Sequence, residues 1–214
     1  MMSTIPKIDF DESTHTYRVA GVVIPSATQI ITGLAMVDFG AVPKHNLIEG
    51  RDRGREVHAI CESFDKGILS IPSIDPRLVG YFKAYLQFCK DFNPEWLEIE
   101  TMYYNQTWGY CMRLDRIGLI GKKIILLDLK TSQMKMPSHC IQTALYQKGW
   151  EENTGKKIHE RWVLQLVEDG KYKIKEHKNN SDFSYALSAV MVYKWKVQNN
   201  MDYDIKANLE MFNF

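Results

Sequence analysis

The clearest alternation of apolar and polar positions lies in residues 109–131, where two apolar runs flank the Gly-Lys pair at 121–122. Two strand-like runs joined by a short glycine-containing turn predict a β-hairpin. Asp115 lies in the first run and Asp128 in the second. Lys130 follows two residues after Asp128, so in a strand both side chains point to the same face. The hairpin is therefore expected to display two acids and a lysine.

Shorter patterns predict the elements on either side of this hairpin. Before it, the sequence predicts a first hairpin at 16–24, a helix at 27–35 with Ser26 as its N-cap, a loop or break at 39–46, helices at 49–66 and 76–92, and a strand at 96–105. After it, the sequence predicts a helix at 138–153 ended by Gly155, a strand pair at 159–167 and 171–176, and a terminal helix at 182–199.

Length and composition fit one soluble, well-cored α/β domain. The chain has 214 residues, of which 45% are hydrophobic and 25% charged, and it contains no obvious linker or repeat. We expect a single domain over 1–214, with an N-terminal hairpin and helices (1–95), a core (96–155) and a C-terminal strand pair and helix (156–214). No apolar stretch approaches the roughly 18 residues that span a bilayer, and no secretory pattern opens the chain. A cytoplasmic protein without membrane contact is expected.

Charge and cysteine usage narrow the expected partners. The formal net charge is +1, so nucleic acid has to be bound by a local patch, which the lysine-rich stretch 171–175 can supply. The four cysteines at 61, 89, 111 and 140 are far apart and form no C-x-x-C pair. This spacing favours reduced, buried thiols, and no iron–sulfur cluster is expected.

The acids and the lysine of the central hairpin have two interpretations. Metal-assisted phosphodiester hydrolysis needs carboxylates to hold a divalent ion, and a lysine to position or deprotonate water and offset phosphate charge. Alternatively, the charged positions form the solvated face of an antiparallel hairpin. The run 124–127 before Asp128 is wholly apolar, which predicts a strand buried on both faces. A charge there is costly unless it is paired or bound to metal, which favours a site.

Polar residues on the helix at 49–66 add to this picture. Gly54 and His58 lie four residues apart, on one helical face. Glycine inside a helix costs about 1 kcal/mol relative to alanine, so it often marks the close approach of another element or of a ligand. A lone helical histidine is otherwise structural or solvated. Arg51, Arg53 and Arg55 can meet phosphates or form a solvated face.

Two further pairs of residues are candidates for the same site. In the strand at 96–105, alternation places Trp96, Glu98 and Glu100 on one face, and one or both acids can reach a metal ion. Gln142 and Tyr146 are four residues apart in a predicted helix, so they project from one face.

Together these motifs resemble the PD-(D/E)XK nuclease superfamily, in particular its RecB-like branch and phage-type exonucleases. The matching segments, in the family's order, are RGREVH at 53–58, Glu100, GYCMRLDRIG at 109–118, LLDLKTS at 126–132 and QTALYQ at 142–147. The resemblance covers about residues 15–150. It implies a mixed central β-sheet flanked by helices, a restriction-endonuclease-like core in which 96–155 is the catalytic part.

The resemblance also implies roles for individual residues. Asp115 and Asp128 are the main metal-binding carboxylates, Glu100 and His58 complete the metal site, and Lys130 acts on the water nucleophile. Two sets support them. Gln142 and Tyr146 orient the lysine, the water or the DNA backbone, and Gly54 with Arg51, Arg53 and Arg55 lies against DNA. Glu100 is preferred to Glu98 from spacing alone.

The implied activity is hydrolysis of DNA with Mg²⁺ or Mn²⁺, as an exonuclease in phage or mobile-element recombination or DNA processing. A bacterial or phage-infected cell is the implied setting. A strand-annealing or recombination protein is a partner suggested by analogy, and a homo-oligomer would suit processive digestion. The alternatives are a structure- or sequence-specific endonuclease of the same fold, and a non-catalytic DNA-binding or interaction module. A chance alignment of polar residues in a plain α/β domain is the remaining interpretation.

Overall fold

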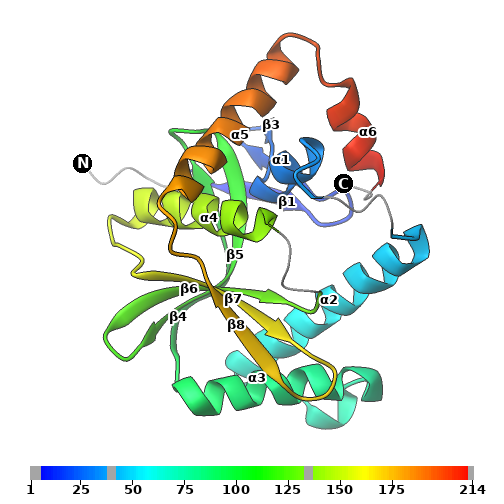
Figure 1. Cartoon of the computed structure of the whole chain (residues 1–214), viewed down its shortest axis with the longest axis vertical. Coiled ribbons are helices and arrows are strands. Elements are labelled where there is room, and N and C mark those ends of the chain that lie inside the picture. Colours follow the sequence, from blue (N-terminus) through cyan, green and yellow to red (C-terminus); the bar gives the residue numbers. More distant parts are fainter. Residues whose placement is uncertain (1–5, 38–41, 133–136, 212–214) are drawn as a thin grey trace.

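The computed structural model describes residues 6–37, 42–132 and 137–211 and has a mixed five-stranded sheet at its centre (Figure 1). The strand order is β4-β5-β6-β7-β8; β6 and β7 are parallel, and the other neighbours are antiparallel. The strands are β4 (Glu95–Asn105), β5 (Tyr110–Ile120), β6 (Lys123–Lys130), β7 (Glu160–Leu166) and β8 (Tyr172–Glu176). The predicted hairpin is confirmed as β5 and β6, which turn at 121–122.

Helices cover both faces of this sheet, which confirms the predicted fold class (Figure 1). On one face, α4 (Ser138–Thr154), α5 (Ser181–Gln198) and α1 (Ala27–Gly33) bury a core with β4, β5 and β6. On the other face, α2 (Lys44–Asp65) and α3 (Val79–Phe92) pack with β6 and β7. Two single turns, η1 (Ile71–Ser73) and η2 (Pro76–Leu78), join these two helices. The apolar run before Asp128 is thus covered on both sides, as its composition predicted.

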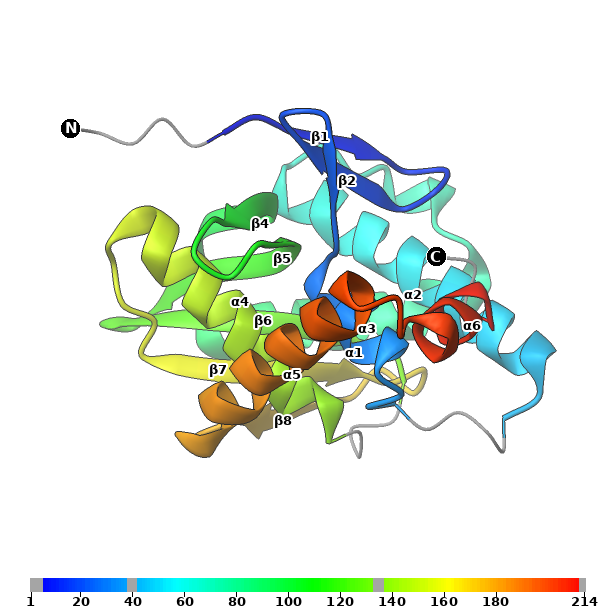
Figure 2. The ribbon, with the colours of Figure 1, turned by 90° about the horizontal axis from the view of Figure 1, so that it is seen from above.

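A second, three-stranded sheet lies along one edge of the molecule (Figure 2). It consists of β1 (Ile8–Asp11), β2 (Thr16–Val19) and β3 (Val22–Ile24), and its apolar side packs against Cys111 of β5. Ala20 and Gly21, at φ 50° and 80°, make the turn between β2 and β3. Positive φ at both turn residues matches the twist of a tight hairpin, so this predicted turn is confirmed.

Local chemistry starts α1 where the sequence predicts. The Ser26 hydroxyl accepts a hydrogen bond from the backbone N–H of Gln29, and the Gln29 side chain accepts one from the backbone of Ser26. This reciprocal capping box satisfies two N–H groups that the helix itself leaves unpaired. Just before the helix, the Pro25 carbonyl oxygen accepts a hydrogen bond from Cys111 N at 2.9 Å. This bond fixes the chain where it leaves β3 and enters α1.

Several boundaries differ from the sequence prediction. β1 and α6 (Tyr203–Met211) were not predicted, and α2 begins at Lys44, inside the segment predicted as a loop. Pro43 precedes this helix, where a missing N–H costs nothing; residues 38–41 of that loop lie outside the described residues. The sheet continues past 155, because β7 pairs directly with β6. Within the described part of the chain, no helix combines the length and apolarity needed to cross a membrane.

Candidate active site

Three potential metal ligands from three different elements converge at one end of the central hairpin. They are His58 of α2, Glu100 of β4 and Asp115 of β5, and their ligand atoms lie within 4.8 Å of one another. His58 Nδ1 lies 3.5 Å from Glu100 Oε1 and 3.7 Å from Asp115 Oδ1. The Glu100 side chain is 7% exposed and that of His58 is 26% exposed. The cluster is therefore largely buried but open on the side of the histidine.

The backbone N–H and C=O groups of Leu129 orient two of these ligands. His58 Nε2 lies 3.1 Å from the Leu129 carbonyl oxygen, and Leu129 N donates to Asp115 Oδ2 at 2.7 Å. A carbonyl oxygen only accepts, so Nε2 must carry the proton that makes the first bond. In a neutral imidazole the other nitrogen, Nδ1, is then a lone-pair donor that faces two carboxylate oxygens. Such a convergence is unfavourable unless a cation or a proton lies between the groups.

The close approach of these groups shifts the pKa values of His58 and Asp115. Burial lowers the pKa of His58, but the carboxylates of Asp115 and Glu100 outweigh it and raise the pKa overall. Burial also raises the pKa of Asp115 to about 6; His58 opposes this shift, and Asp128 and Glu100 add to it. Burial raises the pKa of Glu100, but His58 and nearby arginines outweigh it and lower the pKa overall. Asp115 is thus the acid whose charge is costly in this cluster, and a divalent cation would stabilise it by replacing the proton.

Asp128 and Lys130 meet beside this cluster, on one face of β6 as the two-residue spacing predicted. Lys130 Nζ lies 2.7 Å from Asp128 Oδ2, and Asp128 is 1% exposed. Lys130 forms this ion pair through Oδ2, whereas Oδ1 of Asp128 has no hydrogen-bond partner within the described residues. Burial lowers the pKa of Lys130, but Asp128 and Asp115 raise it overall. Lys130 is therefore an ammonium at neutral pH, and it shares one electrostatic site with both acids.

The prediction that Trp96, Glu98 and Glu100 share one face of a strand is wrong. The register of β4 against β5 shifts between Trp96 and Glu98, so one extra residue turns Glu98 to the opposite face. There Glu98 accepts a hydrogen bond from Tyr103 OH at 2.7 Å. The bulge thus sets Glu98 apart from Trp96. Glu100, at φ +49°, interrupts the alternation a second time, and it is the acid that lies beside His58 and Asp115.

Glu100 is held in an unusual backbone conformation. Its φ is +49°, a region that residues other than glycine enter at a cost. Arg113 Nε donates to Glu100 Oε2 at 2.9 Å and Arg116 NH1 donates to Oε1 at 3.1 Å, so two guanidinium groups fix the carboxylate. Backbone strain that the surrounding structure maintains is concentrated at functional sites in proteins.

Sequence reasoning missed Arg116, which connects the site to the core. Its side chain is fully buried and donates to Asp65 Oδ2 at 2.6 Å and to the Asp115 carbonyl at 2.6 Å. Asp65, at the end of α2, also accepts from Tyr85 OH at 2.7 Å. Arg116 thereby ties α2, α3 and both strands together behind Glu100. The available signal was a second charged residue directly after Asp115 inside an apolar strand.

The predicted pair on α4 is also in contact. Gln142 Nε2 donates to Tyr146 OH at 2.9 Å, and Tyr146 is 5% exposed. Burial strongly raises the pKa of Tyr146, and the negative charges of Asp128 and Asp115 add to this effect. The phenol therefore stays protonated, and its own O–H remains available as a donor toward the acids.

The α2 residues assigned to DNA contact differ in their surroundings. A Cβ placed on Gly54 would meet Thr131 Oγ1 at 3.6 Å, so the end of β6 does pass close to this glycine. Arg53 lies over the Tyr81 ring, 5.7 Å from its centroid, and packs between α2 and α3. Arg51 and Arg55 are both exposed, and Arg51 pairs with Asp52 at 3.1 Å. Contact of these arginines with DNA stays a prediction.

Gly54→Ala separates a packing role from a ligand role. A 3.6 Å approach is ordinary van der Waals contact, so we expect the free energy of unfolding to rise by up to about 1 kcal/mol from helix propensity. If substrate fills the space beside Gly54, the same variant should lose turnover about tenfold or more. Denaturant unfolding and a nuclease assay measure the two effects, and full turnover would show that substrate does not use this space.

A helical glycine in α3 provides the contrasting variant. A Cβ on Gly80 would lie 1.7 Å from the Glu168 carbonyl oxygen, which is backbone and cannot move aside. Gly80→Ala is therefore expected to lower the free energy of unfolding by about 1–3 kcal/mol through overpacking.

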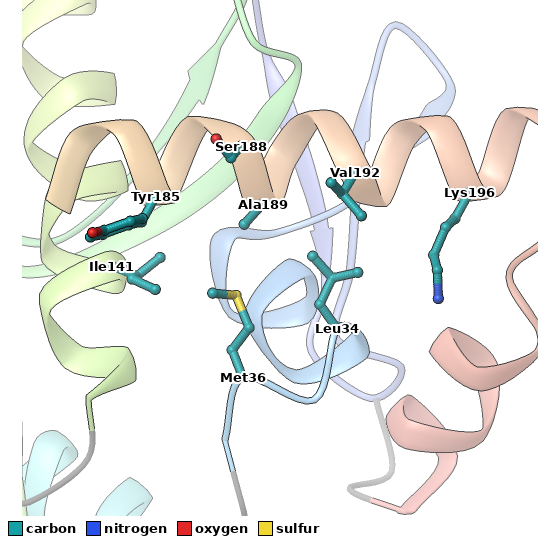
Figure 3. A pocket seen from close by; sticks show the side chains of 8 residues that line it. All are labelled: Leu34, Met36, Ile141, Tyr185, Ser188, Ala189, Val192 and Lys196. Carbon is teal, nitrogen blue, oxygen red and sulfur yellow. The ribbon is translucent and has the colours of Figure 1, made fainter. Parts of the chain in front are cut away.

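A separate apolar groove lies away from these acids, between α5, the end of α1 and the start of α4 (Figure 3). It encloses about 500 Å³ and is lined mainly by aliphatic side chains, with Tyr185, Ser188 and Lys196 of α5 as its polar members. Its lining contains no carboxylate or imidazole. The groove therefore does not contribute to the metal-ligand cluster.

Comparisons with known proteins give structural neighbours only. No family model and no curated protein matches the sequence. The fold is similar to that of a Eubacterium rectale protein assigned as an exonuclease, at 14% identity and a TM-score of 0.48, over 69% of this chain and 68% of that chain. It is also similar to the alkaline exonuclease LHK-Exo of Laribacter hongkongensis, at 11% identity and a TM-score of 0.44, over 87% and 93% of the two chains. At these values the activity has to be inferred from the side chains of this protein.

Proposed function

We propose that this protein is a divalent-metal-dependent deoxyribonuclease that acts as an exonuclease. One observation carries the proposal: His58 Nδ1, Glu100 and Asp115 converge within 4.8 Å beside the buried Asp128–Lys130 pair. Two carboxylates, a lone-pair nitrogen and an adjacent ammonium form a set that suits phosphodiester hydrolysis.

The ligand set fits Mg²⁺ or Mn²⁺. Its carboxylate oxygens suit hard cations, and one imidazole nitrogen is better tolerated by Mn²⁺. Glu100, Asp115 and His58 would hold the ion, with Asp128 adjoining. A bound ion would supply Lewis-acid polarisation of the phosphate and a lowered pKa for bound water. Softer metals favour thiolate, thioether and imidazole ligands. Of these ligand types, the cluster contains only the imidazole of His58.

The other side chains have separable tasks in this proposal. The Lys130 ammonium donates to the attacking water or to a phosphate oxygen and offsets the charge that develops there. Tyr146, whose oxygen accepts from Gln142, directs its own proton toward the acids. Arg116 and Arg113 keep Glu100 in its strained position, so the ligand does not have to reorganise when an ion binds.

Contact with DNA requires a local basic surface, because the net charge of the chain is only +1. Arg55 of α2 is exposed on the helix that carries His58, and Arg113 is 36% exposed beside Glu100. These two are the best-placed phosphate contacts near the site. A role in phage or mobile-element recombination in the bacterial cytoplasm, a strand-annealing partner and a processive homo-oligomer complete the proposal, and they rest on the family resemblance alone.

DNA substrates with and without ends test the proposal. With Mg²⁺ or Mn²⁺, the purified chain should degrade end-labelled linear duplex and leave covalently closed circular DNA intact; chelation with EDTA should stop the reaction. Asp115→Asn should abolish hydrolysis, whereas Glu98→Gln, at the acid that pairs with Tyr103, should retain it. Nicking of the circular DNA would instead favour an endonuclease. Binding of DNA without hydrolysis in either metal would favour a non-catalytic module.

A further inference from the structure

A second group of metal-ligating side chains lies outside the acid cluster. Cys140 of α4, His177 just after β8 and Asp182 of α5 place their ligand atoms within 4.8 Å of one another. None of the three belongs to the proposed nuclease site. His177 and Asp182 are five positions apart in the sequence, and folding brings Cys140 to them; Cys140 and Asp182 lie in the first turns of helices that pack on the same sheet face.

The surroundings that the structure describes leave one ring nitrogen of this group without a partner. Asp182 is 4% exposed, and its Oδ2 accepts from Arg161 NH2 at 2.8 Å. His177 Nε2 is buried and has no hydrogen-bond partner within the described part of the chain. The Cys140 thiol is half-buried and donates to the Pro137 carbonyl oxygen at 2.9 Å, so it becomes a ligand on losing that proton. A buried imidazole nitrogen with no partner is rare in folded proteins and calls for a proton donor or an ion.

Arg161 holds the three segments in place without occupying the space between the ligand atoms. It is 3% exposed and donates to the carbonyls of Cys140 at 3.0 Å and Asn179 at 3.3 Å, as well as to Asp182. The Arg161 carbonyl in turn accepts from the backbone N–H of His177 at 2.9 Å. These bonds fix backbone positions and one carboxylate oxygen. They involve neither the thiol of Cys140 nor the ring of His177.

We propose that Cys140, His177 and Asp182 bind a zinc ion. Thiolate, imidazole and carboxylate together are typical zinc ligands, and a sulfur ligand disfavours Mg²⁺. A thiolate and a carboxylate supply two negative charges, the second of which is shared with Arg161, and water fills the remaining tetrahedral position. The ion joins the start of α4, two residues before Gln142, to the start of α5. Its role is structural, and it does not depend on the proposed nuclease activity.

Cobalt substitution tests this site with a readout that the acid cluster cannot produce. One equivalent of Co²⁺ added to the reduced, metal-free full-length protein should give a near-ultraviolet thiolate-to-cobalt band and intense visible bands typical of tetrahedral Co²⁺, and Zn²⁺ should displace it. Cys140→Ser should lose the near-ultraviolet band. Cys89→Ser, at another half-buried free thiol, should keep it. His177→Gln should weaken binding at least tenfold, and Zn²⁺ should raise the melting temperature of the unmodified protein but not of Cys140→Ser.

Two results would overturn the zinc site: no thiolate band in the unmodified protein, or a band that survives in Cys140→Ser. Glu100→Gln serves to separate this proposal from the nuclease proposal. It should retain the thiolate band at full intensity while losing DNA hydrolysis. A nuclease-inactive protein that still shows the band would contradict the proposed function and leave the zinc site supported.

Discussion

Lys130→Met is expected to reduce DNA hydrolysis by on the order of 10²–10⁴-fold, because it removes an ammonium that adjoins both Asp115 and Asp128. Methionine keeps most of the apolar stem of lysine, so the packing around β6 should survive. The loss should fall on the turnover number rather than on DNA affinity, since the charge acts where the phosphate reacts. Single-turnover digestion of end-labelled duplex at saturating Mn²⁺ measures it.

The same strand provides a matched control for this variant. Lys123→Met removes a lysine from the other end of β6 that is 59% exposed and pairs with Glu160, and it should leave hydrolysis within about twofold of the unmodified protein. Lys130→Met also leaves Asp128 buried without its ion pair, so stability should fall as well. Lys130→Met combined with Asp128→Asn should recover stability but no activity. Full turnover in Lys130→Met would remove lysine from the proposed mechanism.

Residue spacing was sufficient to predict the elements that carry the candidate ligands. Asp128 and Lys130 had to share a face because a strand repeats every two residues, and Gln142 and Tyr146 had to meet because a helix brings positions four apart together. The turn at 121–122 fixed the pairing of β5 with β6. These predictions were local, and each follows from one periodicity.

Features that depend on irregular backbone or on long-range packing could not be predicted in this way. A strict two-residue repeat places Trp96, Glu98 and Glu100 on one face. The bulge before Glu98 and the left-handed φ of Glu100 both break this repeat. Nothing in the local pattern indicates that Arg116 lies between Asp65 and Glu100, which are 35 positions apart in the sequence. The Cys140–His177–Asp182 group was missed for the same reason: the cysteines were judged by their spacing from one another, whereas the structure pairs one of them with His177 and Asp182.

Arg116→Met is expected to lower the free energy of unfolding by about 3–5 kcal/mol, because it strands buried carboxylates that the guanidinium now satisfies. Arg116 is fully buried, and the side chain of its partner Asp65 is 2% exposed. Burial raises the pKa of Asp65 even with Arg116 beside it, so the carboxylate is already costly to keep charged. Urea unfolding, followed by tryptophan fluorescence, measures the change. Mn²⁺ affinity should fall together with stability, since Glu100 loses the donor to its Oε1.

Two further variants distinguish a buried network from a simple loss of charge. Arg113→Met removes the other guanidinium from Glu100, but Arg113 is 36% exposed, so the stability loss should stay within about 1 kcal/mol. Adding Asp65→Asn to Arg116→Met should recover part of the lost stability, because the stranded negative charge is removed, while Mn²⁺ affinity should remain low. If Arg116→Met unfolded at the same urea concentration as the unmodified protein, the buried network would not stabilise the fold. The position of Glu100 would then depend on its backbone and on Arg113 alone.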